Sequence, residues 1–194
     1  SSWTEVNDLN TGRSAGGGCG SQTAALYAGG YVAPATAASE EYDGTNWAEG
    51  NDLNTAREGL AGAGSQTAGL IFGVDGHTEE YNGTSWAEQN NLNTSRYGTA
   101  GFGSQTAALC GGGGPPTTGA TETYNGTSWT EVNDLNTARQ YLIGAGTTTA
   151  GIAMGGHATL TVTEEFDGTD WTETADLSTG RFGGVSGGTS SATL

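Results

Sequence analysis

The chain has 194 residues and carries 21 Asp and Glu against five basic residues, all of them Arg, which gives a formal net charge of −16. This balance excludes a nucleic-acid-binding surface, which needs a basic face, and disfavours attachment to anionic membranes. No run of 18 apolar residues exists that could span a bilayer, and the five Trp, seven Tyr and four Phe are too many for a disordered chain.

A tandem repeat of about 40 residues dominates the sequence. Every Arg follows a Trp by ten residues, and the segments between them are near-identical, as in WTEVNDLNTGR and WAEGNDLNTAR. A Glu precedes the next Trp by seven residues, and the length variation falls in one connection per unit, before that Glu. The repeated Trp residues are Trp3, Trp47, Trp86, Trp129 and Trp171, and the repeated Arg residues are Arg13, Arg57, Arg96, Arg139 and Arg181.

Within each unit the pattern predicts four β-strands and no helix. Taken in chain order, they are a stretch of small residues after the Arg, as in 57–64, an apolar run such as 23–30, a TEEY stretch such as 78–81, and SWTEV at 128–132. The third and fourth strands are separated by Asn-Gly or Asp-Gly, which supplies the positive φ of a tight hairpin. Four short strands per repeat are typical of a propeller blade.

The order Arg, small residues, apolar strand, Gly-Gly, variable loop, Glu-x-Tyr, turn and Trp resembles the kelch repeat over essentially the whole chain. The double Gly is replaced by Gly73-Val74 in the second unit. The Asn-Gly-Thr-Ser-Trp units also resemble repeats of tail-fibre and virion proteins of marine bacterial viruses. The resemblance implies an all-β, kelch-like β-propeller with four-stranded antiparallel blades.

Counting Trp and Arg predicts a single domain, 1–194, of five blades. The expected units are 11–50, 55–89, 94–132, 137–174, and 179–194 joined by 1–6. In this arrangement the N-terminal strand closes the ring by pairing with the C-terminal blade, which removes exposed strand edges. The fifth unit lacks a recognisable third strand, so either the closing blade has three strands or the parent chain is longer.

Structural roles are expected for the repeated Trp and Arg. A large ring in every unit fits packing between blades, with a sugar platform as the alternative. The Arg is expected to act as a planar, multidentate clamp on acidic or carbonyl groups such as those of Asp8 or Glu40 and their equivalents. Cys19 and Cys110 lie at different positions of different units and are expected to be free, with a disulfide as the alternative.

The variable connections between the second and third strands are where ligand specificity is expected, with tolerant surface loops as the alternative. They contain the candidate binding residues Tyr31, His77, Pro115 and His157. No catalytic residues are expected, because His77 and His157 lie in non-adjacent units and two histidines do not make a catalytic zinc site. No cofactor is expected. The Asn-Asp pairs at 7–8, 51–52 and 133–134 leave calcium binding open, although Asn and Asp also form turns.

These features predict a non-catalytic structural or receptor-binding propeller of a virion or extracellular fibre. Its expected partners are a glycan or cell-surface receptor and other virion or fibre proteins. The alternatives are a lectin-like carbohydrate-binding module and a protein-interaction kelch domain.

Overall fold

The computed structural model describes residues 4–184, which form sixteen β-strands in four antiparallel sheets of four. Each sheet comes from one repeat unit, and its strands lie side by side in chain order. The short 3-10 helix η1 (Val74–Gly76) lies in the second unit. In this part of the chain no helix is long and apolar enough to cross a membrane.

The four sheets, called blades 1 to 4, have the following strands. Blade 1 contains β1 (Gly17–Ser21), β2 (Ala24–Ala28), β3 (Ser39–Tyr42) and β4 (Trp47–Glu49). Blade 2 contains β5 (Ala61–Ser65), β6 (Ala68–Phe72), β7 (Thr78–Tyr81) and β8 (Trp86–Glu88). Blade 3 contains β9 (Ala100–Ser104), β10 (Ala107–Gly111), β11 (Thr121–Tyr124) and β12 (Trp129–Val132). Blade 4 contains β13 (Ile143–Thr147), β14 (Ala150–Met154), β15 (Thr163–Phe166) and β16 (Trp171–Glu173).

Two kinds of tight turn shape each blade. Between the third and fourth strands, the side-chain Oδ1 of Asn125 accepts hydrogen bonds from the backbone N–H groups of Thr127 and Ser128, both 2.9 Å long. Gly126 follows with φ of 90°, a left-handed conformation that favours glycine. Gly103 has φ of 112° near the hairpin that joins the first two strands. The sequence-encoded turns thus fix where each strand ends.

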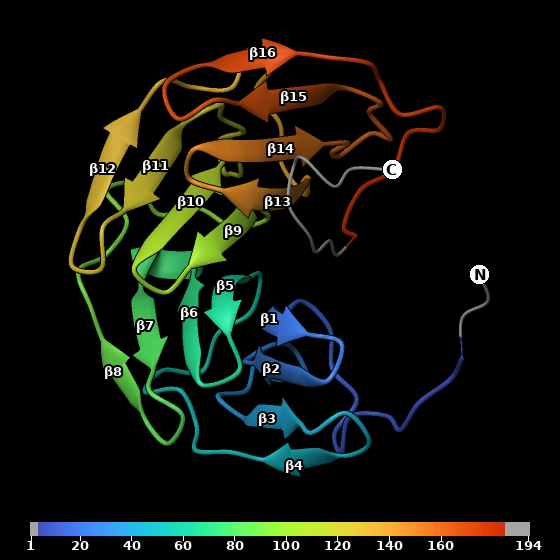
Figure 1. The fold of residues 1–194 in the computed structure, drawn as a ribbon, viewed down its shortest axis with the longest axis vertical. Helices are drawn as coiled ribbons and strands as arrows, with labels where there is room; N and C mark the ends of the chain where they lie inside the picture. Colours follow the sequence, from blue (N-terminus) through green and yellow to red (C-terminus); the bar gives the residue numbers. More distant parts are fainter. Residues whose placement is uncertain (1–3, 185–194) are drawn as a thin grey trace.

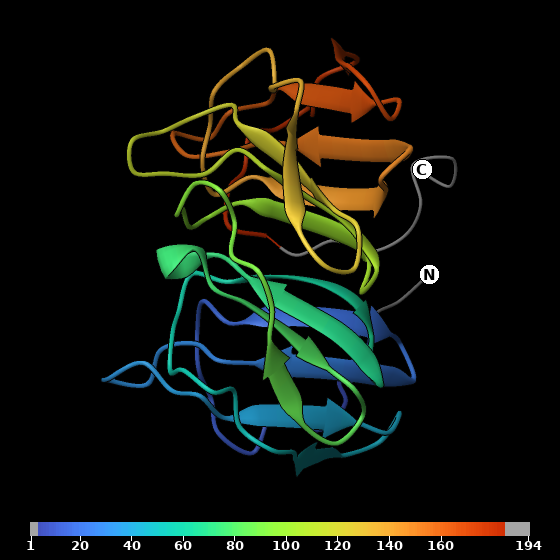
Figure 2. The same cartoon turned by 90° about the vertical axis from the view of Figure 1, so that its left-hand side faces the viewer.

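The blades are arranged around a central axis (Figure 1). The first strand of each blade, β1, β5, β9 and β13, lies nearest the axis, and the fourth strand lies at the periphery. The connections between the second and third strands project on one side of the molecule, as the segments 29–38, 73–77 and 112–120 show in Figure 2. The variable loops are therefore gathered on one face.

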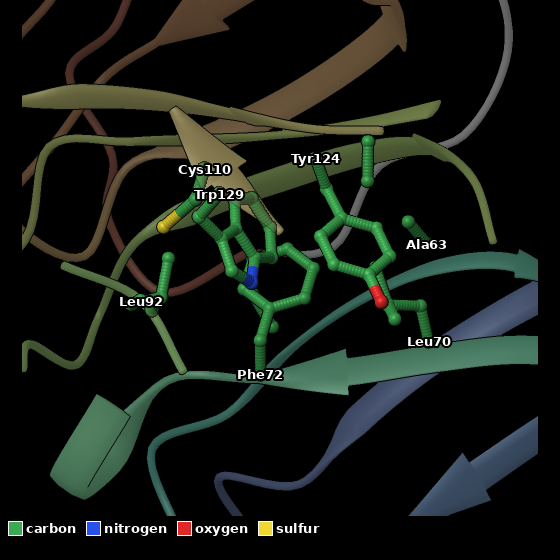
Figure 3. Close-up of a cluster of buried hydrophobic side chains, with 9 residues drawn as sticks. Ala63, Leu70, Phe72, Leu92, Cys110, Tyr124 and Trp129 are labelled. Atoms are coloured by element: carbon green, nitrogen blue, oxygen red, sulfur yellow. The ribbon is translucent and has the colours of Figure 1, made fainter. Parts of the chain in front are cut away.

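The hydrophobic core lies between neighbouring blades rather than within one. Figure 3 shows the cluster between blades 2 and 3, where Leu70 and Phe72 of β6 face Tyr124 and Trp129 of blade 3. The rings of Phe72 and Trp129 meet edge to face with centroids 4.8 Å apart. Similar clusters join blades 1 and 2 and blades 3 and 4. Because each blade completes the core of its neighbour, the stability of a blade depends on its interfaces with the adjacent blades.

The predicted all-β class and four-stranded antiparallel blades are confirmed, but the prediction of five blades is wrong: the structure has four. The fifth blade was assigned to 179–194 and 1–6. Its described residues, 179–184 and 4–6, form no strand, and residues 1–3 and 185–194 lie outside the described part. Each blade needs a third strand, and the sequence contains four of these for its five Arg. The expected closure through the N-terminal strand is therefore not part of the described fold.

Candidate functional site

Buried Arg–Glu pairs tie the start of each blade to its third strand. Arg13, Arg57, Arg96 and Arg139 pair with Glu40, Glu79, Glu122 and Glu164 respectively. The Arg96 Nη2 to Glu122 Oε1 distance is 2.9 Å, and both side chains are 1% exposed. These glutamates are the ones that precede each Trp by seven residues, whereas Asp8, the other acid named with Glu40, is exposed.

The loop that precedes each Arg repeats the same hydrogen bonds to the paired Glu in all four blades. We call the Arg, the Glu and this loop together the arginine clamp. In the clamp of blade 4, Asn136 holds the second carboxylate oxygen of Glu164 through its backbone N–H, at 2.7 Å, and its side-chain amide, at 2.9 Å. The N–H of Thr137 donates to the first oxygen at 3.3 Å. The Asn, Thr and Arg of the repeated Asn-Thr-x-Arg sequence thus surround one carboxylate. All the hydrogen-bonding partners of this carboxylate serve to hold the blade together.

Three of the repeated Trp side chains, those of Trp86, Trp129 and Trp171, each fill the same place in one of the three interfaces between blades. Trp129 is 5% exposed, and its Nε1 donates to the hydroxyl of Thr78 in blade 2 at 2.9 Å. Trp171 donates in the same way to the hydroxyl of Thr121 in blade 3 at 3.2 Å, whereas Trp86 donates to the backbone carbonyl of Asn51, after blade 1, at 2.9 Å. Trp47 is half-buried, and Trp3 lies outside the described residues. No surface platform for a sugar is formed by Trp86, Trp129 or Trp171.

Three of the four candidate loop residues lie beside the segments that follow the Arg. The N–H of Tyr31 donates to the carbonyl of Ser14 at 2.7 Å, and the N–H of His157 donates to that of Gln140 at 2.7 Å. Pro115 follows Gly114, whose N–H donates to the carbonyl of Tyr97 at 3.1 Å. Each of the three therefore lies beside the segment that leads from the Arg into the first strand of a blade.

His77 is placed differently. Its carbonyl accepts a hydrogen bond from Arg57 Nη1 at 3.0 Å, and its ring Nδ1 lies 3.9 Å from Glu88 Oε1 on the peripheral strand β8. The histidines of the two loops are therefore not brought together.

An axial cavity of about 290 Å³ opens among the first strands of the four blades. Half of the residues in its wall are glycines, and the larger side chains are Tyr27, Leu60, Tyr141, Leu142 and Ile143. Glycine keeps the inner strands close: a Cβ on Gly101 would lie 2.7 Å from the Cβ of Ala61. The wall offers backbone, aliphatic and aromatic surface to a ligand.

Four aromatic side chains form a row that includes Tyr141 of the cavity wall, and we call it the aromatic row. Tyr97 and Tyr141 have ring centroids 5.9 Å apart, Tyr141 and His157 6.2 Å, and His157 and Phe182 6.1 Å. His157 is exposed and Phe182 is 53% exposed. The row thus presents aromatic surface to solvent next to a concave site.

Tyr141 is the most constrained member of the row. Its φ is 57°, in the left-handed region that bulky residues rarely occupy. At the same distance from their Arg, the other units have Ala15, Gly59, Gly98 and Gly183, all with positive φ. A tyrosine therefore stands where the backbone favours glycine, which is typical of functional positions.

The phenol of Tyr141 is held in its neutral form. Burial, a hydrogen bond with Tyr97, and the nearby charges of Tyr97 and Glu58 raise its pKa. A neutral phenol can both donate and accept a hydrogen bond. Tyr141 is therefore suited to bind a hydroxyl-bearing ligand.

Sequence reasoning missed three members of the aromatic row, Tyr97, Tyr141 and Phe182. The signal was present in the residues directly after the Arg. The first two residues of that stretch are small in SAGGG, but they include an aromatic residue in YGTAG, QYLIG and FGGVS. These residues belong to the predicted first strand of each unit, for which no binding role is expected.

The Asn-Asp pairs considered for calcium have other partners in the structure. Asn51 donates its side-chain amide to the carbonyl of Thr84 at 2.6 Å, and Asn133 donates to Asp170 at 2.5 Å, both in the next blade. Among residues 4–184 no three His, Cys, Asp or Glu side chains are grouped so that they could hold a metal ion. Calcium binding, left open by the sequence, stays untested.

Four-stranded antiparallel blades around an axial cavity define this chain as a β-propeller. Its structure is similar to that of the β-propeller protein YjhT, with a TM-score of 0.77. The match covers 94% of this chain and 71% of the YjhT chain at 13% sequence identity, so the shared property is the fold. No protein-family profile matches the sequence, and no curated protein matches it. The kelch and viral-repeat resemblances stay predictions.

Proposed function

We propose that this propeller is a non-catalytic receptor-binding element of a virion or extracellular fibre, and that the receptor group is a glycan bound at the aromatic row. The observation that carries the proposal is Tyr141, an aromatic side chain held at positive φ beside the axial cavity. Such strain persists where it serves a function. The virion or fibre setting rests on the resemblance of the repeats.

The chemistry of the row favours a carbohydrate. Aromatic rings such as Tyr141 and Phe182 offer flat apolar faces that pack against the C–H faces of sugars, while the phenols of Tyr97 and Tyr141 supply polar groups at the same site. Successive rings lie about 6 Å apart, so the row is long enough for more than one sugar unit.

The electrostatics favour a neutral or amino sugar over an acidic one. Four of the five Arg side chains are buried and paired with Glu, so their charge is already compensated. Glu58 adds a negative charge near Tyr141. A chain with a net charge of −16 repels anionic ligands at long range.

The buried carboxylates of the arginine clamps are not suited to act as general acids. Burial alone raises the pKa of Glu164, but hydrogen bonds from Arg139 and Asn136 and the charge of Arg139 hold it below its usual value. The pKa of Glu40 is lowered in the same way. A general acid needs the opposite shift, so these carboxylates are suited to structural use.

A glycan array followed by calorimetry on the best ligand tests this proposal. Tyr141→Gly should abolish binding and leave the free energy of unfolding within about 1 kcal/mol, because it relieves the positive φ while removing one ring. His157→Ala should weaken binding, whereas His77→Ala, in the matching loop of blade 2, should not. Binding that persists in Tyr141→Gly would contradict the proposed site.

A structural role within a fibre is the second candidate, favoured by the near-identity of the repeats. Silence across the array, together with unchanged self-association of Tyr141→Gly, would favour this role. Capture of a defined protein partner through the variable loops would favour the protein-interaction alternative.

A further inference from the structure

The two residues that follow each repeated Arg have a different chemistry in every unit, although the residues before the Arg hardly change. We call these five pairs the collar: Ser14-Ala15, Glu58-Gly59, Tyr97-Gly98, Gln140-Tyr141 and Phe182-Gly183. The second residue of every pair lies in the wall of the axial cavity. The collar therefore places unlike side chains at equivalent positions around one cavity.

Backbone hydrogen bonds link neighbouring pairs of the collar. The N–H of Gly59 donates to the carbonyl of Ala15 at 2.7 Å, that of Tyr141 to Gly98 at 2.6 Å, and that of Gly183 to Tyr141 at 2.9 Å. Because the main chain makes these bonds, the fold does not dictate the side chain of the first residue in each pair. The differences between the first residues are thus available for binding a ligand.

Glu58 is the one charged residue of the collar. It is exposed, and among residues 4–184 it makes no ion pair, whereas the glutamates of the four arginine clamps are all buried and paired with Arg. Its carboxylate can therefore pair with a positive charge from outside the chain.

Two tyrosines of the aromatic row lie beside Glu58. The adjoining Gly59 packs against Tyr97, since a Cβ at Gly59 would lie 3.0 Å from the Cβ of Tyr97. Burial, Tyr97 and the charge of Glu58 together raise the pKa of Tyr141, so Glu58 lies close enough to act on this phenol. The rings of Tyr97 and Tyr141 have centroids 5.9 Å apart. An aromatic face attracts a cation, as a carboxylate does, so the three side chains share a preference for positive charge.

We propose that Glu58, Tyr97 and Tyr141 form a subsite for a positively charged amino or quaternary ammonium group of the bound ligand. The inference rests on the proposed function, because it assigns the charged group of a ligand that binds along the aromatic row. It makes the receptor group an amino sugar rather than a neutral or N-acetylated one. A net charge of −16 draws cations to the molecule, and Glu58 holds one beside the two rings.

Two trisaccharides with the same sugar backbone test the subsite. One is a glucosamine trisaccharide with trimethylammonium groups, which carries permanent positive charges, and the other is its neutral N-acetylated form. Isothermal titration calorimetry on the full chain should show that the cationic sugar binds about fivefold more tightly or better. Glu58→Gln should reduce this preference to about twofold and leave the affinity for the neutral sugar unchanged.

Glu131→Gln is the matched control, because it removes one exposed carboxylate from β12 and changes the net charge of the chain by the same amount. It should keep the full preference for the cationic sugar. Glu58 is exposed, so Glu58→Gln should leave the unfolding midpoint unchanged, and a lost preference then reports on binding.

Equal affinity of the parent chain for the two sugars, or a preference that persists in Glu58→Gln, would overturn this inference alone. A preference that is lost equally in Glu131→Gln would also contradict it, by showing that net charge attracts the cation. Absence of binding to both sugars, or binding of both that survives Tyr141→Gly, would overturn the proposed function and the subsite with it.

Discussion

Each arginine clamp buries two opposite charges in a chain that has five cations in all. Desolvation of both groups is compensated by the pair itself and by the hydrogen bonds of the loop. The match is incomplete, because the Nε atoms of Arg13, Arg57, Arg96 and Arg139 are buried without a hydrogen-bond partner among the described residues. The main effect of the clamp is therefore to fix the segment before the first strand against the third strand, and its net contribution to stability is small.

Removing one partner of a clamp should be costly. Glu164→Gln leaves the guanidinium of Arg139 buried without its counter-charge, which should lower the free energy of unfolding by about 3 kcal/mol or more. Glu165→Gln, at the exposed neighbouring position of β15, should change it by less than about 0.5 kcal/mol. Urea unfolding monitored by Trp fluorescence measures both, and similar losses in the two variants would contradict the role of the clamp.

The clamps should also make stability depend on pH. Because the pKa values of Glu40 and Glu164 are lower in the folded protein than in the unfolded chain, their stabilising contribution is complete above the ordinary Glu pKa of about 4.5. It is lost as the pH falls through the folded-state pKa. Thermal unfolding should therefore weaken progressively below about pH 5.

The double variant Arg139→Met with Glu164→Leu should lose less stability on acidification than the parent chain. An identical pH profile for the two proteins would show that other groups dominate the acid transition.

At the scale of the strand pair, glycine determines how the first hairpin of each blade turns. Gly20, Gly64, Gly103 and Gly146 occupy equivalent positions with φ between 100° and 120°. A Cβ at Gly103 would lie 2.3 Å from the carbonyl oxygen of Ala107 on the paired strand. Both the dihedral angle and the space therefore require glycine here.

Gly103→Ala should destabilise the protein by about 2 kcal/mol or more, from the unfavourable φ together with the backbone clash. Gly12→Ala is the matched control, since a Cβ there meets nothing within 4 Å, and its effect should stay within about 0.5 kcal/mol. Differential scanning calorimetry of both variants checks this. A tolerated Gly103→Ala would mean that the hairpin adopts another turn in solution.

At the scale of the whole molecule, the four strands of each blade could be predicted from the sequence, whereas the predicted number of blades was wrong. Strand alternation and the Asn-Gly turns predicted four strands per unit, because these signals are local. The blade count is not local: Arg181 begins a clamp, yet the chain has no fifth glutamate of the Glu40 type. Counting complete Arg–Glu pairs instead of Trp and Arg gives four.

The binding site was harder to predict for a related reason. Tyr97, Tyr141, His157 and Phe182 come from four separate segments, and the positive φ of Tyr141 follows from the fold rather than from its neighbours in sequence. His157 is the one member of the row that the sequence predicts as a binding residue. Its aromatic neighbours in the row lie far from it in sequence and meet it only in the folded protein.

The free energy of unfolding should depend least on Trp47 and most on the Trp residues that lie between two blades. Trp47 and Trp129 pack alike on the tyrosine of their own blade, with ring centroids 5.1 Å and 5.0 Å apart. Trp129 also contacts Phe72 and donates to Thr78 in the preceding blade, whereas the described residues include no blade before Trp47. The two positions thus isolate the contribution of the neighbouring blade.

Trp129→Ala should lower the free energy of unfolding by about 3 to 5 kcal/mol, as expected for a large aromatic core residue. Trp47→Ala should cost about 1 to 2 kcal/mol less, because it removes no edge-to-face contact and no buried hydrogen bond across an interface. Chemical unfolding followed by circular dichroism compares the two variants directly. Equal losses would show that in solution Trp47 is covered as completely as Trp129, and that blade 1 has a neighbour on both faces.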